Sequence, residues 1–273
     1  MKIALNAKHW GLIDLMYGVL RNHDVRLQEP FDGHMVHQGD EDLIISTFAY
    51  TDLPDYKGDK PLIIYATDPV PLFILDKFRE VQKQKNVTIV ISERCYPQEV
   101  QPILKSYTEI PFAIDANRYF PYTGEINKVL IANRKPHDRW DEIIKGVTGL
   151  GCPLSEYLEG IPFDIAAIQS NAEYRETIGK YKVMFYFSNS PYTIVMFEGM
   201  TLGIPMVGFN HFNISSSSPV EKYLHNYSTD KDEIRRMLKL ELDKPVKKES
   251  YNIIGMDDAV SRWDKLIKEI CMK

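Results

Sequence analysis

The segment from Tyr181 to Phe209 constrains the fold most strongly, because it carries the start and stop signals of a strand, a helix and a second strand. The apolar run 183–187 is typical of a buried parallel strand. The turn-forming residues after it lead to Ser190, a good N-cap, and Pro191 suits the first position of a helix. We therefore predict that a helix begins directly after this strand.

The end of this helix, which we place at 192–202, is equally clear. Gly203 stands where a left-handed C-cap belongs, Pro205 prevents continuation, and 206–209 resumes an apolar strand. A helix that starts at the carboxyl end of a parallel strand favours phosphate, through its free backbone N–H groups and its dipole. The loop before the helix is thus a candidate phosphate site.

Glu198 is the acidic residue of a helix that is apolar on most sides. An isolated buried charge is costly, so this carboxylate needs hydrogen-bond partners if it is buried. Two interpretations follow from the residues alone. Loop amides for phosphates and a carboxylate for hydroxyls would together suit a sugar nucleotide. Alternatively, Glu198 and Thr201 form a narrow solvated stripe and the loop binds nothing.

Short apolar runs alternate with segments of helical length along the whole chain. The expected strands are 2–5, 43–46, 62–66, 87–92, 129–132, 183–187 and 206–209. The expected helices are 11–21, 72–83, 98–106, 139–148, 170–179 and 192–202. This alternation predicts an α/β fold with parallel sheets flanked by helices.

A domain boundary is predicted within Ile110–Gly124, which has two prolines, a polar centre and a terminal glycine. We expect an N-terminal Rossmann-like domain at 1–122 and a second at 123–255, facing a central cleft that binds the ligand. The tail, 256–273, has apolar residues at helical spacing and could pack back on the N-terminal domain.

Composition excludes several classes of protein. The net charge of −5 is not that of an extended nucleic-acid surface, and no apolar run is long enough to span a membrane. The three cysteines are odd in number and widely spaced, which predicts a reducing compartment. The N-terminus lacks the pattern of a secretory signal. We therefore expect a cytoplasmic protein without a transmembrane segment.

Three stretches in order resemble the retaining nucleotide-sugar glycosyltransferases of the two-domain GT-B fold (glycosyl transferases group 1). Ile110–Pro121 is similar to their linker pattern of Ile-Pro, Ile/Val-Asp and Phe-x-Pro. The stretch 129–146 resembles their strand followed by an Arg and, five residues on, a Lys, here Arg134 and Arg139. The stretch 198–205, Glu-Gly-Met-x-x-Gly-x-Pro, is close to their Glu-Ala-Met-Ala-x-Gly-x-Pro.

The resemblance implies a role for each matching position. Arg134 and Arg139 would contact the donor diphosphate, and guanidinium groups suit this role because they bind phosphate oxygens bidentately. Glu198 would accept hydrogen bonds from the donor ribose. The donor-binding loop would comprise Ser190, Tyr192, Thr193 and Ile194, which bring backbone amides to the phosphates or the sugar. From the residues alone, Arg134 could instead be an ordinary surface residue after a strand, and Arg139 a helix-start partner of Asp138 or Glu142.

Two departures from the family pattern bear on the donor sugar. The family carries a first glutamate eight residues before the second, followed by a glycine-rich turn, whereas this chain has Ser190 followed by Pro-Tyr-Thr. That carboxylate normally contacts the transferred sugar, so its replacement leaves the sugar open. The second basic position, Arg139, keeps the charge of the usual lysine but changes the geometry.

Candidates on the acceptor side come from strand-end loops of the N-terminal half. His9 and Gly11 follow the first strand, and Asp68 follows the strand 62–66, although the residues alone favour an Asx turn before Pro69 at this position. We count Asp68 with Arg134 and Arg139 as a catalytic candidate. His34 and His37 near Asp40 lack the ligand number of a closed metal site, and we expect no metal and no cofactor.

These observations predict an enzyme, a hexosyl- or pentosyltransferase that moves a sugar from a nucleoside diphosphate sugar to an acceptor with retention of configuration. The acceptor stays open between a glycan, a lipid, a small molecule and a modified nucleic acid. The alternative is an inactive nucleotide-sugar binding module of the same fold, prompted by Ser190. A phosphorylase or an epimerase on a related fold is a third possibility.

Overall fold

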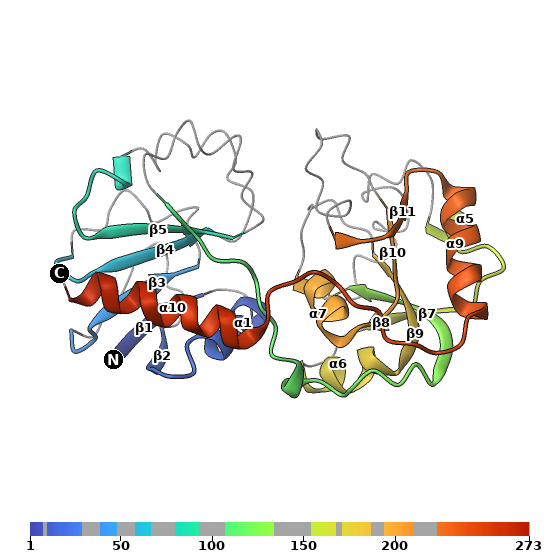
Figure 1. The fold of residues 1–273 in the computed structure, drawn as a ribbon, viewed down its shortest axis with the longest axis horizontal. Helices are drawn as coiled ribbons and strands as arrows, with labels where there is room; N and C mark the ends of the chain where they lie inside the picture. Colours follow the sequence, from blue (N-terminus) through green and yellow to red (C-terminus); the bar gives the residue numbers. More distant parts are fainter. Residues whose placement is uncertain are drawn as a thin grey trace. The chain divides into compact units, whose positions relative to one another are not determined.

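The chain forms two parallel β-sheets, one in each of two units (Figure 1). The computed structural model describes residues 1–7, 10–28, 39–47, 58–66, 80–92, 107–133, 154–167, 171–186, 194–209 and 223–272. The first unit comprises Met1–Ile114 together with Ile254–Lys273, and the second comprises Asp115–Ile253. The chain therefore passes between the units twice.

The sheet of the first unit has the strand order β2-β1-β3-β4-β5-β6, and its neighbouring strands are paired in parallel. The strands are β1 (Lys2–Asn6), β2 (Asp24–Gln28), β3 (Leu43–Ser46), β4 (Leu62–Ala66), β5 (Val87–Ile91) and β6 (Thr108–Glu109). Every residue of β3 and β4 is buried. Such continuous apolar runs are typical of strands covered on both faces.

Helices α1 (Trp10–Val19) and α10 (Met256–Cys271) lie side by side in the first unit (Figure 1). Trp263 of α10 is fully buried, and its ring makes an edge contact with Tyr65 of β4 at a centroid distance of 5.1 Å. His23, soon after α1, lies 2.9 Å from Asp264 of α10. The C-terminal helix is thus part of the core of the first unit.

The sheet of the second unit has the order β11-β10-β9-β7-β8, also with parallel pairing. Its strands are β7 (Ile126–Asn133), β8 (Phe163–Ala167), β9 (Tyr181–Tyr186), β10 (Met206–Phe209) and β11 (Asn226–Ser228). Its helical segments are η3 (Ala116–Arg118), α5 (Leu154–Tyr157), α6 (Asn171–Thr177), η6 (Ile178–Lys180), α7 (Ile194–Leu202) and α9 (Lys231–Asp243).

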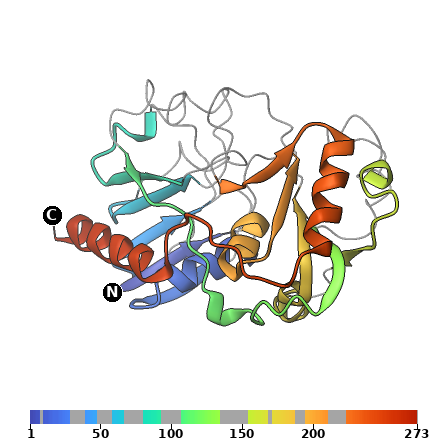
Figure 2. The ribbon, with the colours of Figure 1, turned by 45° about the vertical axis from the view of Figure 1, so that its right-hand side comes forward.

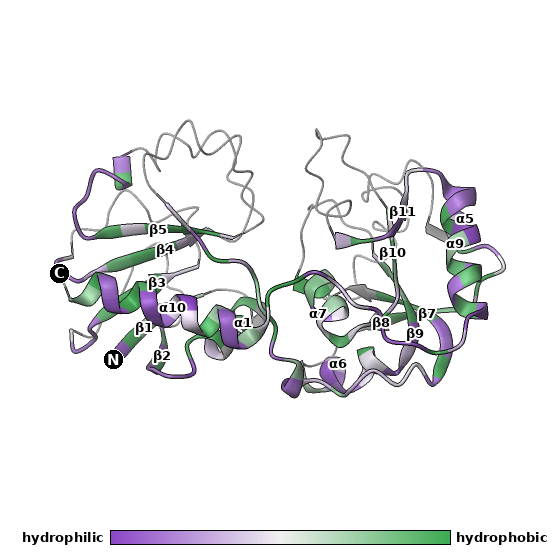
Figure 3. Ribbon diagram, in the orientation of Figure 1, coloured by the Kyte–Doolittle hydropathy of each residue, from purple (hydrophilic) through white to green (hydrophobic). Residues whose placement is uncertain are grey.

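Helices α7 and α9 cover opposite faces of the second sheet (Figure 2). Val183 and Phe185 of β9 belong to one apolar cluster with the buried side of α9. Met184, which points to the other face because side chains alternate along a strand, lies against α7. Hydrophilic and hydrophobic residues alternate along α9 and α10 (Figure 3), as expected for helices with one buried side.

The βαβ unit β9–α7–β10 confirms the strand, helix and strand expected from the sequence. Gly203 ends α7 with a φ of 76°, the left-handed C-cap that we predicted. At Gly199 an added Cβ would lie 3.0 Å from the sulfur atoms of Met184 and Met206. The small residue therefore lets α7 approach the sheet closely.

The predicted strands at 43–46, 62–66 and 206–209 are found with these bounds, and four others differ only at their ends. Four strands were not predicted: β2, β6, β8 and β11. Helix α9 was also missed, although Asp230 caps it through a hydrogen bond from the Glu233 N–H. The helices expected at 98–106 and 139–148 lie outside the described residues.

Candidate functional site

The strand order of the second unit identifies a topological switch point between β7 and β9. The chain passes from β7 to β8 on one side and then returns to pair β9 on the other side of β7. Ligands of open α/β sheets bind outside the carboxyl ends of the strands at such a point. Here these ends are Asn133 and Tyr186. The candidate site is therefore the edge of the sheet at which α7 begins.

Glu198 lies on α7 and its side chain is buried, with 1% of the residue exposed. One carboxylate oxygen, Oε1, accepts a hydrogen bond from the Tyr119 hydroxyl at 2.5 Å. The other, Oε2, accepts one from the Tyr174 hydroxyl at 2.8 Å. These contacts exclude the solvated stripe considered above. They also supply the polar partners that a buried carboxylate requires.

The two tyrosines come from different elements. Tyr174 belongs to α6 and is itself 1% exposed. Tyr119 follows η3, whose start is capped by Asp115, and is half-buried. The Tyr119 N–H donates to the Ala116 carbonyl oxygen, which closes the turn. Glu198 is thus held on one side by a buried tyrosine of α6 and on the other by the segment that enters the second unit.

Arg175 adds a cation to this group of residues. Its guanidinium carbon lies 6.0 Å from the centroid of the Tyr119 ring. Its carbonyl oxygen accepts a hydrogen bond from the Phe120 N–H at 2.9 Å. Burial lowers the pKa of Arg175 from its ordinary value, but a guanidinium remains charged at neutral pH. The site therefore combines a carboxylate, two phenols and a guanidinium.

The predicted site residues fall into two groups. Glu198 and Ile194 are described: Ile194 opens α7 and is half-buried. Gly11 is described as the second residue of α1, in the other unit, near the carboxyl end of β1. His9, Asp68, Arg134, Arg139, Ser190, Tyr192 and Thr193 lie outside the described residues. In the chain these follow β1, β4, β7 and β9.

Sequence reasoning missed Tyr119 and Tyr174. A weak signal was present, because a buried Glu198 requires donors and Tyr119 lies inside the linker motif that resembles the glycosyltransferases. Nothing in the sequence distinguishes Tyr174 from the chain's other tyrosines. Its position on α6 and the packing of α6 against the rest of the unit are needed to identify it.

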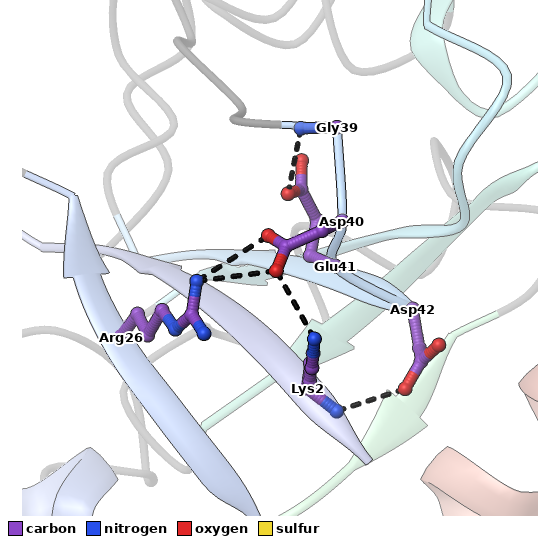
Figure 4. Close-up of polar contacts among 6 residues, drawn as sticks. All are labelled: Lys2, Arg26, Gly39, Asp40, Glu41 and Asp42. Atoms are coloured by element: carbon purple, nitrogen blue, oxygen red, sulfur yellow. Dashed lines mark hydrogen bonds and ion pairs between the residues drawn. The ribbon is translucent and has the colours of Figure 1, made fainter.

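The acidic residues before β3 form polar contacts (Figure 4): Asp40 forms ion pairs, and Glu41 and Asp42 accept hydrogen bonds from the backbone N–H groups of Gly39 and Lys2. Asp40 lies 3.1 Å from the ammonium group of Lys2 and 3.3 Å from the guanidinium of Arg26. Its hydrogen bond from Lys2, assisted by the charge of Arg26, lowers the pKa of the Asp40 carboxyl despite some desolvation. His34 and His37 lie outside the described residues. Within the described residues, no group of three or more His, Cys, Asp or Glu side chains could hold a metal ion.

No protein-family model matches this sequence, and no curated protein matches it. Among solved structures, a protein from Listeria monocytogenes assigned as a UDP-N-acetylglucosamine 2-epimerase is similar, with a TM-score of 0.59 and 11% identity over 98% of this chain and 96% of that chain. The calicheamicin glycosyltransferase CalG4 has a TM-score of 0.46 and 10% identity, over 99% and 94% of the two chains. An O-GlcNAc transferase mutant from Thermobaculum terrenum has a TM-score of 0.39 and 10% identity, over 100% and 64%.

The two parallel sheets and the likeness to the Listeria protein confirm the predicted fold class, two Rossmann-like domains of the GT-B type. At 11% identity this likeness establishes the fold only. Within the part of the chain that the structure describes, no helix has the length and apolar character needed to span a bilayer.

Proposed function

We propose that this chain is a retaining glycosyltransferase that moves a sugar from a nucleoside diphosphate sugar to an acceptor. The observation that carries the proposal is the position of Glu198, buried on the helix that follows a switch-point strand and embedded in the Glu-Gly-Met-x-x-Gly-x-Pro motif. The segments 134–153 and 187–193 follow, in the chain, β7 and β9, the two strands that flank the switch point. All residues proposed for the diphosphate come from these segments.

Each residue has a role that its chemistry suits. Arg134 and Arg139 bind the diphosphate and stabilise the negative charge that builds on it as the glycosidic bond breaks. Backbone amides at Tyr192 and Thr193 act in the same way, at the positive end of the α7 dipole. Glu198 accepts hydrogen bonds from the ribose. A departing phosphate oxygen takes the proton of the acceptor hydroxyl, which attacks on the same face of the sugar.

Ser190 is the position that bears on the donor sugar. A serine is shorter than the glutamate of the related pattern and carries no charge, so it gives a different set of hydrogen bonds to the sugar. Asp68, which follows β4 in the chain of the other unit, is proposed as a catalytic residue, and His9 and Gly11 are proposed for the acceptor side. We propose no metal, and a cytoplasmic location.

The test is the turnover of Arg134→Ala and Arg139→Ala, measured as release of nucleoside diphosphate together with appearance of the sugar on an acceptor. Arg236→Ala is the control, because Arg236 is an exposed arginine of α9, 3.8 Å from Glu233. We expect Arg134→Ala and Arg139→Ala each to lose at least about a hundredfold in turnover, as when one transition-state donor is removed, and the control to keep its rate. Near-normal turnover in both Arg134→Ala and Arg139→Ala would overturn the assignment.

A nucleotide-sugar epimerase is the second candidate, prompted by the fold likeness to the protein assigned as a UDP-N-acetylglucosamine 2-epimerase. Conversion of a nucleotide sugar without any acceptor would favour this reaction. The third is an inactive binding module, which would bind nucleoside diphosphates but release no sugar. One incubation of donor with and without acceptors separates all three.

A further inference from the structure

The hydrogen bonds that Tyr119 and Tyr174 donate to Glu198 differ in how accessible they are. The bond from Tyr174 is buried, and its donor belongs to α6. The bond from Tyr119 is only partly buried, and its donor lies outside any helix or strand, between η3 and β7. A ligand that approaches from solvent therefore reaches the Oε1 side of the carboxylate before the Oε2 side.

The chemistry of the two possible partners of Oε1 is the same. A phenol and a ribose hydroxyl are both O–H donors, and each forms a short, strong bond with a carboxylate oxygen. Tyr119 thus presents to Glu198 the type of group that a ribose would present. The carboxylate is satisfied while no ligand is bound, which avoids the cost of a buried charge without partners.

We infer that Tyr119 acts as an internal substitute for a ribose hydroxyl and that nucleotide binding replaces its hydrogen bond at Glu198 Oε1. The inference rests on the proposed function, which assigns the ribose to Glu198. Tyr174 keeps its bond to Oε2 throughout and fixes the carboxylate. The exchange makes Tyr119 a residue that tunes affinity for nucleotides and touches no reacting atom.

The exchange predicts that nucleotide affinity increases when the Tyr119 hydroxyl is removed, and a purely structural role for Tyr119 does not predict this increase. When a ligand must first displace an internal partner, its apparent affinity is reduced. It equals the intrinsic affinity multiplied by the fraction of molecules in which that partner is already released. Removing the Tyr119 hydroxyl removes this competition. Nucleotide affinity should therefore rise in Tyr119→Phe. If the hydrogen bond only stabilised the fold, its loss would leave nucleotide affinity unchanged or lower it.

The experiment is calorimetric titration of the full chain with ADP, GDP, CDP and UDP, in the wild type, Tyr119→Phe and Tyr122→Phe. Tyr122 is the matched control, because its hydroxyl lies on the same segment but donates to the Lys182 carbonyl oxygen. The diphosphate that binds most tightly is then tested as its 2′,3′-dideoxy form, which lacks both ribose hydroxyls. Circular dichroism verifies that each variant is folded.

We expect Tyr119→Phe to bind the ribonucleotide about threefold to tenfold more tightly, roughly the equilibrium effect of one hydrogen bond. This gain should disappear with the dideoxy form, and Tyr122→Phe should match the wild type. Equal or weaker binding by Tyr119→Phe, or the same gain with the dideoxy form, overturns the inference and leaves the proposed function intact. A folded wild type that binds none of the four diphosphates overturns the proposed function, and the inference with it.

Discussion

Replacing Tyr174 with Phe tests the energetic importance of the buried carboxylate at the candidate site. The substitution keeps the aromatic ring, so it removes the hydrogen bond to Glu198 Oε2 at 2.8 Å without creating a large cavity. Both residues are 1% exposed, so water does not easily replace the lost donor. Hydrogen bonds to charged groups contribute roughly 1.5–3 kcal/mol. We expect the variant to lose about 2 kcal/mol in free energy of unfolding.

The assay is urea denaturation at neutral pH followed by circular dichroism, in a double-mutant cycle with Glu198→Gln. Removing the carboxylate charge should reduce the cost of Tyr174→Phe by about 1 kcal/mol. Tyr181→Phe is the control, because its hydroxyl donates at 3.0 Å to the more exposed carboxylate of Asp164 and should cost less. A Tyr174→Phe variant within about 0.5 kcal/mol of wild type, or the same cost in both backgrounds, would refute the reasoning.

Two further predictions concern the second unit. Gly203→Ala should destabilise the chain by about 2 kcal/mol, because a left-handed conformation costs an L-residue roughly 1–2 kcal/mol and the new Cβ would lie 3.0 Å from the Glu249 carbonyl oxygen; denaturation midpoints equal to wild type would contradict it. Stability should also fall as the pH rises above about 10, because burial, together with nearby carboxylates, raises the pKa of Tyr122 and of Tyr181 to about 12. The folded state binds these protons more tightly than the unfolded state, so their contribution is complete below the ordinary tyrosine pKa and is lost as the pH passes the raised values. Urea denaturation at increasing pH measures this loss, which Tyr122→Phe should reduce; a flat profile up to pH ~12 would contradict the assignment.

The βαβ unit β9–α7–β10 could be predicted from the sequence because each of its signals is local. Gly203 and Pro205 end the helix through backbone conformations that hardly depend on the rest of the chain. Strands such as β3 and β4 were equally clear, because burial on both faces leaves a continuous apolar run. For these elements, the structure is determined over a few neighbouring residues, and sequence reasoning succeeded.

The four missed strands share one property: they are strands because they pair with a neighbouring strand, and their own residues do not predict it. All four, β2, β6, β8 and β11, are sheet edges whose sequences are short or mixed in polarity, such as Asp24–Gln28. Only their neighbours β1, β5, β7 and β10 supply the ladder. Helix α9 is a different case. Its cap, Asp230 with Glu233 three residues on, and its apolar spacing were present in the sequence, so this helix could have been predicted.

Glu198 shows where sequence reasoning about the candidate site reaches its limit. Because the helix around Glu198 is apolar, we predicted that its carboxylate, if buried, has hydrogen-bond donors, and Tyr119 and Tyr174 are such donors. The donors lie 79 and 24 residues away in the chain, so no local spacing could identify them. Their identity matters for function, because a carboxylate that already accepts two phenol hydrogen bonds has its polar partners before any ligand binds. A nucleotide that binds at Glu198 has to share these hydrogen bonds or replace one, and the accessibility of Tyr119 decides which one is replaced.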